Sequence, residues 1–346
     1  ARVTIDGREM MMFASYNYLG LITHPKIKKA AIEAIEKYGT GAAGVRLLAG
    51  TTKIHEKLEA KIAKFTGGED AVTYSSGYVT NLAAITTLCQ RGDLVVIDKL
   101  DHASIIDGCL LSGATHRSYL HNDMESLERI LSNSGRYINK LIIVDAVYSM
   151  DGDVSNLPEI SRLAKKYNAK VMVDEAHSIG VLGKTGHGIE EHFELKGAVD
   201  IHMGTLSKTI PSIGGYLAGD KDLISYLKHN SRPFIFSASL PPVAAATAIA
   251  CLEVIEIFAR LLLPILVYVP IKYLYPTGEK QEKSNLKYVK YFQDADIIAG
   301  DYLGISQYMP EDMGGKTIIT NTITSSNVED LKKRGVNYLI TTTPEF

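Results

Sequence analysis

The chain has 346 residues, of which 46% are hydrophobic and 22% are charged, so it is long enough to form one large domain or two ordinary ones. A net charge of −2 gives no electrostatic reason to expect nucleic acid or an anionic membrane as a partner. The cysteines, Cys89, Cys109 and Cys251, are scattered and form neither a metal-type pair nor a disulfide framework. A reducing cytoplasm is therefore the expected location, and no metal site is expected.

The sequence predicts neither a signal peptide nor a membrane span. Asp6, Arg8 and Glu9 stand where a signal peptide would need an apolar core. One apolar stretch, 257–275, is a candidate for a membrane span, but its longest uncharged run, from Leu261 to Ile271, has 11 residues. A spanning helix needs about 20, so we expect a buried or amphipathic segment there.

Strand and helix signals alternate along most of the chain. Segments 24–39 and 51–67 have apolar residues at helical spacing and end in glycine. Short runs rich in β-branched residues follow, with helix-like segments such as 157–168 between them: 70–76, 93–99, 140–149, 169–176 and 199–207. This alternation predicts an α/β fold of three layers, in which helices cover both faces of a mainly parallel sheet.

The composition changes near residue 255. Residues 1–255 hold 27 alanines and residues 256–346 hold three. We therefore expect a core domain, 1–255, with an N-terminal segment, 1–40, and a large cofactor-binding part, 41–240. The remainder, 256–346, is expected to be a small and atypical α/β segment with a strand, a strand, a helix and a strand at 295–300, 316–323, 325–335 and 336–342.

The strongest chemical pattern joins two apolar runs, each followed by reactive residues. Asp174 and His177 follow the first run and Lys208 follows the second. In open α/β sheets this edge binds ligands. A lysine amine reacts with an aldehyde cofactor when part of the amine is neutral. A carboxylate beside a pyridine nitrogen keeps that nitrogen protonated, which makes the pyridine ring an electron sink. Each residue alone is common on a turn, but their combination predicts a pyridoxal-phosphate (PLP) site.

Two weaker patterns precede this one. The segment YSSGYVTNLAAI, 74–85, is predicted to run from a strand through a small-residue turn into a helix. The N-terminus of that helix would offer backbone amides to a phosphate, and Gly77 would allow close approach. His102 follows another strand and has a suitable place to stack on an aromatic ring, although a single histidine is more often a capping or surface residue.

Taken together, the motifs of residues 10–255 resemble the α-oxoamine synthase family of PLP enzymes. The resemblance rests on segments that include ASYNYLGL, LDHASIIDG, HNDMESLE, VYSMDGDVSNL, VDEAHSIGVLGKTGHG, GTLSK and FSASLPP. It implies an aminotransferase-like fold of type I with a seven-stranded sheet. It also implies condensation of a small amino acid (serine, glycine or alanine) with an acyl-CoA, with loss of CO2. Ser207 favours the serine palmitoyltransferase-like branch over the 2-amino-3-oxobutyrate and oxononanoate enzymes, which more often have glycine there.

The resemblance also implies a role for each residue near the cofactor ring. Lys208 would bind the cofactor covalently and later transfer a proton. Asp174 would pair with the pyridine nitrogen, His177 and Ser149 would hold the ring hydroxyl, and His102 would stack on the ring.

Four further residues are assigned to the phosphate: Gly77 and Tyr78 through backbone amides, and Thr205 and Ser207 through their hydroxyls. Asn17 matches a position near the amino-acid substrate. The segment 236–239 would reach a partner subunit's cofactor, which implies a homodimer with shared sites.

The C-terminal segment departs from the family pattern. We find no counterpart of the family's small C-terminal domain, which carries an arginine for the substrate carboxylate. Residues 256–346 instead resemble the C-terminal part of clostridial-type proteins named quinate 5-dehydrogenase, yet they lack a glycine-rich dinucleotide motif. Two alternatives to an active synthase follow: a truncated or chimeric protein that binds the cofactor without turnover, and an NAD(P)-linked oxidoreductase acting through the tail.

Overall fold

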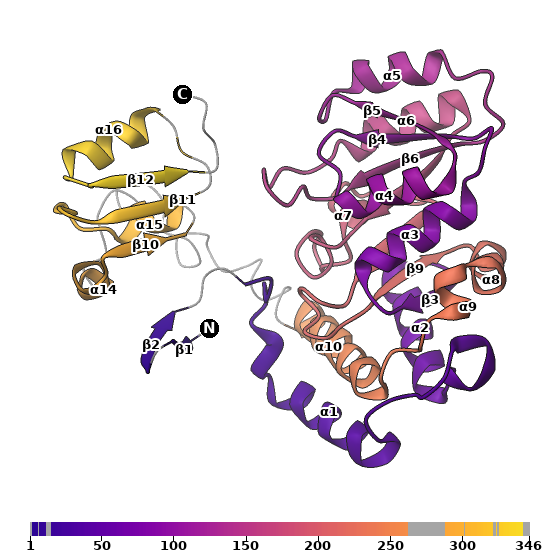
Figure 1. The fold of residues 1–346 in the computed structure, drawn as a ribbon, viewed down its shortest axis with the longest axis horizontal. Coiled ribbons are helices and arrows are strands. Elements are labelled where there is room, and N and C mark those ends of the chain that lie inside the picture. The colour runs from indigo at the N-terminus through magenta and orange to yellow at the C-terminus, as the bar shows by residue number, and fades with distance from the viewer. Residues whose placement is uncertain are drawn as a thin grey trace. The chain divides into compact units, whose positions relative to one another are not determined.

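The computed structural model describes residues 2–5, 7–11, 15–261, 288–300, 302–320, 323 and 325–341. The chain divides into two compact units, one of Tyr16–Pro264 and one of Ala1–Ser15 with Ile265–Phe346 (Figure 1). The first is called the large unit below. The expected domains, 1–255 and 256–346, stay a prediction.

The large unit is built on a seven-stranded sheet with the order β3-β9-β8-β7-β6-β4-β5. The strands are β3 (Asp70–Tyr74), β4 (Leu94–Asp98), β5 (Thr115–Tyr119), β6 (Lys140–Asp145), β7 (Lys170–Asp174), β8 (Ile201–Thr205) and β9 (Gly215–Gly219). Pairings from β5 through β8 are parallel, and β9 runs antiparallel to both β8 and β3. The predicted mainly parallel seven-stranded sheet is confirmed.

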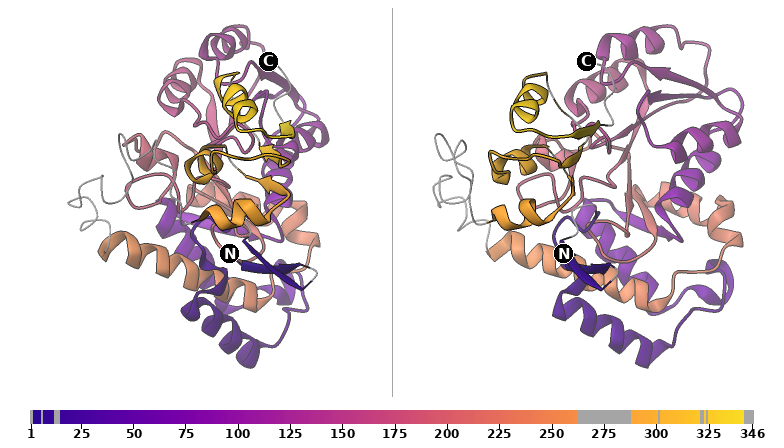
Figure 2. Two further views of the ribbon diagram at one scale, coloured as in Figure 1. Left: turned by 90° about the vertical axis from the view of Figure 1, so that its left-hand side faces the viewer. Right: turned by 60° about the vertical axis from the view of Figure 1, so that its left-hand side comes forward.

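Helices cover both faces of this sheet (Figures 1 and 2). Alternate residues of one strand enter different cores: Val95 and Ile97 of β4 pack in one cluster, and Leu94 and Val96 in another. The helices are α1 (Pro25–Tyr38), α2 (Lys53–Thr66), α3 (Gly77–Leu88), α4 (Ala103–Ser112), α5 (Met124–Ser132), α6 (Leu157–Tyr167), α7 (Ile189–His192), α8 (Lys221–Asn230), α9 (Arg232–Phe236) and α10 (Pro242–Leu261), with shorter turns η1 (Leu21–Thr23) and η2 (Arg46–Gly50). The three-layer architecture therefore holds.

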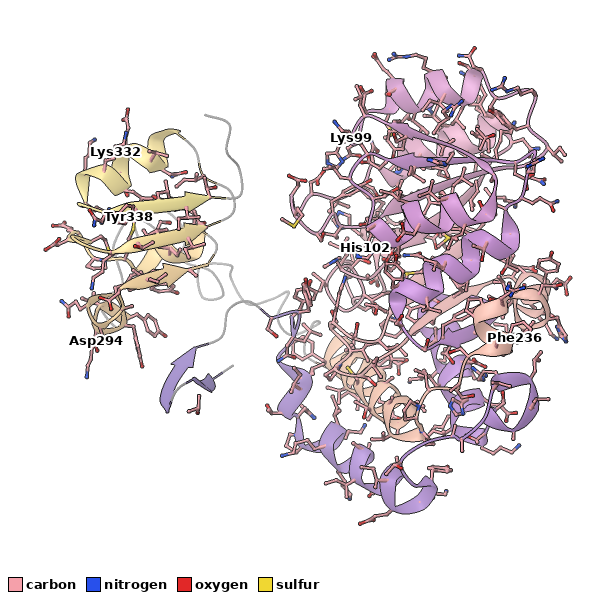
Figure 3. The ribbon with its side chains drawn as sticks, in the orientation of Figure 1. Lys99, His102, Phe236, Asp294, Lys332 and Tyr338 are labelled. Carbon is pink, nitrogen blue, oxygen red and sulfur yellow. The ribbon has the colours of Figure 1, made fainter. Side chains whose placement is uncertain are left out.

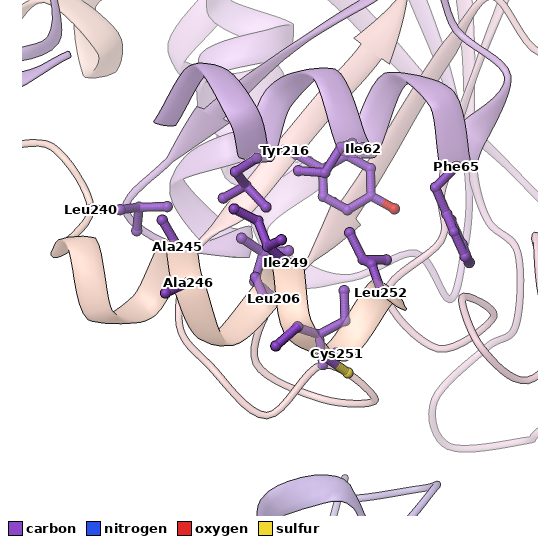
Figure 4. Packing of buried hydrophobic residues seen from close by; sticks show 14 of the residues in the cluster. Ile62, Phe65, Leu206, Tyr216, Leu240, Ala245, Ala246, Ile249, Cys251 and Leu252 are labelled. Carbon is purple, nitrogen blue, oxygen red and sulfur yellow. The ribbon is translucent and has the colours of Figure 1, made fainter. Parts of the chain in front are cut away.

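Helix α10 crosses the composition change near residue 255 without a break. Ile255 and Ala259 are buried, and the helix packs with α1 and α2 around the core drawn in Figure 4. It is the one helix of the described residues long and apolar enough to cross a membrane, over Pro242–Ala259, but 67% of that window is buried inside the protein. Its apolar character is therefore that of a core helix. The run from Leu261 to Ile271 lies, apart from Leu261, outside the described residues.

The other unit contains a three-stranded parallel sheet in the order β10-β11-β12. Its elements are α14 (Val289–Asp294), β10 (Ile297–Ala299), α15 (Tyr302–Tyr308), β11 (Thr317–Thr320), α16 (Ser325–Lys333) and β12 (Tyr338–Thr341), and the same unit holds the hairpin of β1 (Arg2–Ile5) and β2 (Arg8–Met11). The three predicted strands and the predicted helix are present, together with α14 and α15, which were not predicted.

The two faces of this small sheet differ in how the described helices cover them. Ile318 of β11 packs in a core with Ile305 of α15 and Leu331 of α16. On the opposite face four large side chains are exposed: Ile297, Ile319, Tyr338 (labelled in Figure 3) and Ile340. This apolar surface is therefore left uncovered by α14, α15 and α16, the helices that the structure describes in the tail unit.

Candidate active site

The candidate site lies at the carboxyl ends of the parallel strands of the large unit. β6 ends at Asp145, β7 at Asp174 and β8 at Thr205. Asp145 and Asp174 are register partners on neighbouring parallel strands, so their side chains share one face of the sheet. Both are buried, and the charge of Asp174 is one of the causes that raise the pKa of Asp145, after burial itself. Two buried carboxyl groups thus lie side by side at the ligand-binding edge of the sheet.

Lys208 follows β8 and contacts the histidine that follows β7. Its Nζ is 2.6 Å from His177 Nε2, and His177 Nδ1 is 2.6 Å from the hydroxyl of Tyr18. If the Lys208 ammonium donates to Nε2, the Nδ1–H of His177 donates to Tyr18. Nζ also lies 5.4 Å from the ring centre of Tyr16. These contacts hold the amine at the end of the sheet.

Burial shapes the acid–base behaviour of this pair. It lowers the pKa of Lys208, against the opposing charges of Asp174 and Asp145. It also lowers the pKa of His177 to about 4, with further lowering by Lys208 and His102. His177 is therefore neutral at physiological pH. A larger fraction of Lys208 is neutral than for an exposed lysine, which a nucleophilic amine requires.

Asp174 is held by a short chain of hydrogen bonds. The Asn81 amide, Nδ2, donates to Asp174 Oδ2 at 2.8 Å and to Ser104 Oγ at 2.9 Å, while the amide of Ala176 donates to Asp174 Oδ1 at 2.9 Å. Ser104 Oγ lies 2.7 Å from His102 Nδ1. His102, labelled in Figure 3, is the N-cap residue of α4. The network fixes the carboxylate and joins it to the histidine expected to stack on the ring.

The N-terminus of α3 forms an anion cradle. Ser76 Oγ caps the helix by accepting from the amide of Val79 at 3.1 Å, and the amides of Gly77 and Tyr78 fall in the first turn, where no intrahelical acceptor exists. Thr205 Oγ1 lies 2.9 Å from Ser207 Oγ. A Cβ on residue 77 would come within 2.9 Å of Thr205 Oγ1, so glycine is needed where helix and hydroxyls meet.

These groups fit PLP. The cofactor needs an amine for its aldehyde, a carboxylate for its ring nitrogen and amides and hydroxyls for its phosphate. Lys208, Asp174 and the cradle at Gly77 supply them at one sheet edge, and the buried Asn81 Oδ1 and Asp145 Oδ1 have no partner within the described protein. The fold and this arrangement define a PLP-dependent protein of fold type I as the class the chain matches.

Two predicted residues lie at the margin of this arrangement. Ser149 is exposed in the turn after β6. Asn17 Oδ1 accepts from the amide of Ile22 at 3.3 Å, ahead of η1. Their roles at the cofactor ring and the amino-acid substrate stay predictions. Two surface hollows, beside the start of α1 and beside 181–192, are lined by other residues.

Two residues that hold predicted ones, Tyr18 and Asn81, were not predicted from the sequence. Tyr18 lies one position after Asn17, in the motif ASYNYLGL, but its partner His177 is 159 residues away. Asn81 lies four residues after Gly77, on the same face of α3, and its partner Asp174 is 93 residues away. The spacing of four residues from Gly77 was the available sequence signal for Asn81. No sequence signal indicated that Asp174 is the partner of Asn81.

Comparison with known proteins supports this class. Residues 8–261 match the model of the family "Aminotransferase class I and II". The chain belongs to this family, within its α-oxoamine synthase branch. It is 51% identical over 256 residues to 8-amino-7-oxononanoate synthase of Thermoanaerobacter pseudethanolicus, and 49% identical over 255 residues to serine palmitoyltransferase of Bacteriovorax stolpii.

The structural likeness covers a similar extent. Serine palmitoyltransferase from S. paucimobilis, solved with bound PLP, matches with a TM-score of 0.72 at 37% identity and covers 74% of this chain and 64% of its own. The 8-amino-7-oxononanoate synthase of Francisella tularensis matches with a TM-score of 0.62 at 28% identity, over 82% of this chain and 74% of its own. The matched part of the chain spans 65% of the length of the Thermoanaerobacter synthase and 61% of the length of the Bacteriovorax enzyme. It makes up 74% and 73% of this chain, respectively.

The C-terminal part matches a different family model. Residues 234–346 match a domain of unknown function, DUF8754. This match begins in α9, before the composition change, and continues through it. It gives no support to the expected likeness to quinate 5-dehydrogenase.

Proposed function

We propose that the chain binds PLP and condenses a small amino acid with an acyl-CoA thioester, releasing CO2 and CoA. The observation that carries the proposal is the contact of Lys208 Nζ with His177 Nε2 at 2.6 Å, beside the buried carboxylate of Asp174. The relatives named above, which act in this class of condensation, support the choice of reaction.

Bound PLP would supply an electron sink for the carbanion left by deprotonation or decarboxylation of the amino acid. Asp174, fixed by Asn81, would keep the ring nitrogen protonated. Lys208 would bind the aldehyde carbon through Nζ and, once displaced by substrate, would accept and return a proton at the same atom. His177, neutral and held by Tyr18, would orient Lys208 and donate to or accept from the ring hydroxyl.

Arg46 and Arg334, two arginines outside the predicted site, each already pair with a carboxylate of the chain. Arg46 is not free to hold the substrate carboxylate, because its Nη1 pairs with Glu59 Oε1 at 2.7 Å and contacts Thr73 Oγ1 at 2.9 Å in a buried network. Arg334 pairs with Asp330 at 2.9 Å in the tail unit. Serine, glycine and alanine are proposed as substrates, and Ser207 supports the serine palmitoyltransferase-like choice, although oxononanoate synthases are equally similar overall.

Borohydride reduction followed by peptide mapping tests the cofactor assignment. Reduction of the PLP-loaded protein should label Lys208 and leave Lys184 and Lys221 unlabelled, and the Lys208→Ala variant should take no label. Labelling of either of the other lysines would show that the site is misplaced.

A thiol-release screen tests the reaction. With serine, glycine or alanine and a set of acyl-CoAs, the protein should release free CoA only when both substrates are present. A second candidate, a protein that binds PLP without turnover, is favoured by the short coverage of the relatives. Cofactor labelling without thiol release for any pair would establish that candidate instead.

We further propose a homodimer, from the match of 236–239 to a segment that reaches the partner's cofactor. Phe236 in this segment is 72% exposed, as an interface residue would be in one subunit alone. Light scattering at the mass of one chain, with the cofactor bound and turnover intact, would contradict the dimer. A cytoplasmic location is proposed from the cysteines, which are all free and buried.

A further inference from the structure

A histidine outside the candidate site is held between two carboxylates. His121, in the turn after β5, places Nδ1 at 2.9 Å from Asp98 Oδ1 and Nε2 at 3.1 Å from Asp153 Oδ2. Carboxylates only accept, so both ring nitrogens must donate to satisfy both contacts, and that requires the imidazolium form. The ring also lies edge to face against Tyr148, with 4.5 Å between ring centres.

The two carboxylates belong to different parts of the fold. Asp98 ends β4, is fully buried and also accepts from the amides of Leu100 and Asn122, each at 2.8 Å. Asp153 is 40% exposed and lies in the hairpin 147–154, which follows β6. His121 therefore connects a fixed point of the sheet to a surface hairpin.

Asn122 also holds the hairpin, because its Nδ2 donates to Asp153 Oδ2 at 3.2 Å and to the carbonyl of Val154 at 3.1 Å, and these two hydrogen bonds do not depend on pH. Val147 pairs with Val154, the amide of Tyr148 donates to the carbonyl of Asp153 at 3.1 Å, and Ser149 lies exposed near its tip. The amide of Ala146, just before it, donates to the carbonyl of Asp174 at 2.9 Å. The first residue before the hairpin is therefore hydrogen-bonded to Asp174, at the end of β7.

We propose that His121 is a positioning residue whose imidazolium, held between Asp98 and Asp153, fixes the hairpin 147–154 and with it Ser149. The role of Ser149 at the cofactor ring rests on the proposed function, whereas the attachment of the hairpin does not. Deprotonation removes one of the two ring donors, so one of the two carboxylates loses its hydrogen bond to His121 and the hairpin loosens.

The charged surroundings set the direction of the pH dependence. Burial lowers the pKa of His121, but the hydrogen bond and charge of Asp98 and the charge and hydrogen bond of Asp153 raise it, with a net increase above the ordinary value. Tyr119 and Tyr148 are the other titratable groups packed nearby, and burial raises the pKa of both, so they stay neutral. The imidazolium attachment is therefore complete below the pKa of an unfolded histidine and is lost as pH rises through the raised folded pKa.

Hydrogen–deuterium exchange of the full chain without cofactor tests this attachment. At about pH 6, the His121→Asn variant should exchange the amides of 146–156 about tenfold faster than the wild type, because a hydrogen bond to a charged group is lost. The difference should shrink at about pH 9, where the wild type has lost the proton. His121→Arg, a cation at every accessible pH, should keep the hairpin protected at both.

Asp153→Asn and His229→Asn complete the comparison. Asp153→Asn changes a half-exposed side chain and should loosen the hairpin as His121→Asn does, with the exchange of α10 unchanged. His229, exposed on α8, contacts only the carbonyl of Ser225 among its described partners, so its substitution should leave the hairpin unaltered. Equal exchange of the hairpin in wild type and His121→Asn at both pH values, or a difference that does not depend on pH, would overturn the proposal.

A cofactor titration separates this inference from the proposed function. If the wild type binds PLP, His121→Asn should weaken the binding several-fold more at about pH 6 than at about pH 9. If the wild type binds no PLP, the proposed function fails while the exchange experiment still decides the role of His121. Undiminished affinity in a variant with a loosened hairpin would show that the hairpin does not serve the cofactor.

Discussion

Substitution of Asn81 tests whether the Asp174 carboxylate needs its buried partner. Asn81 is 1% exposed, and the two hydrogens of its amide go to Asp174 Oδ2 and Ser104 Oγ. A hydrogen bond to a charged group contributes about 1.5–3 kcal/mol, which corresponds to about 10- to 150-fold in an equilibrium constant. We therefore expect Asn81→Ala to weaken PLP binding within that range.

Asn81→Asp isolates the electrostatic part, because it keeps the volume of the side chain. It places another carboxyl group beside Asp174 and Asp145, both already buried. Ionised, it repels Asp174 and accepts instead of donating, so the loss of affinity at about pH 8 should equal or exceed that of Asn81→Ala. At about pH 6 part of the affinity should return, because a raised pKa leaves the new acid protonated and able to donate.

The assay is titration of PLP into the protein without cofactor, followed by the absorbance of the bound form, with thermal unfolding measured in parallel. Asn133→Asp is the control, because Asn133 is exposed at the end of α5 and its side-chain amide donates to the carbonyl of Arg129, far from the candidate site in sequence. PLP affinity of Asn81→Asp equal to the wild type at alkaline pH would refute the reasoning.

Three further predictions concern neighbouring features. Asp174→Ala should reduce PLP affinity and turnover far more than Glu175→Gln, because Glu175 accepts from the amide of Ile189 and serves the core instead; equal losses would contradict this. The pKa of His177 is about 4 in the folded protein and about 6.5 in the unfolded chain, so between these pH values the unfolded chain binds a proton that the folded protein does not, and stability falls as pH falls. In the His177→Asn variant the melting temperature should therefore depend less on pH over this range. An unchanged pH dependence of the melting temperature would exclude the effect. A chain that ends at residue 264 should keep its melting temperature and PLP affinity. A chain that ends at residue 255 should have a lower melting temperature, because the end of α10 is removed. Loss of PLP binding in the chain that ends at 264 would show that the tail serves the cofactor.

The sequence predicted the central strands because they are buried on both faces and rich in β-branched residues. β4 reads LVVID and β6 reads KLIIVD, and their identity as strands needs no knowledge of the rest of the fold. β5 reads THRSY, lies at the edge of the sheet and is largely uncovered, so its polar residues gave no such signal. β9 reads GYLAG, and its glycines weaken the strand signal.

The candidate site shows the same division between local and distant information. Lys208 and Asp174 lie in motifs of consecutive residues, which can be recognised from the sequence alone. Their partners Tyr18 and Asn81 are brought to them only by the folding of strands far apart in sequence. A partly neutral Lys208 was expected from its chemistry. The burial that lowers its pKa, and the two carboxylates Asp145 and Asp174 that oppose this lowering, are known only from the folded structure.

The uncovered face of the tail sheet has a practical consequence for handling this part of the protein. Parallel sheets in water normally have helices on both faces, yet Ile297, Ile319, Tyr338 and Ile340 are exposed on a face that none of the described helices covers. Produced as a separate fragment, residues 288–346 would present these side chains to other molecules, and the fragment would self-associate at the concentrations used for spectroscopy. A lysine in place of Ile340 or Tyr338 would break the continuous apolar surface and give a fragment suited to solution work.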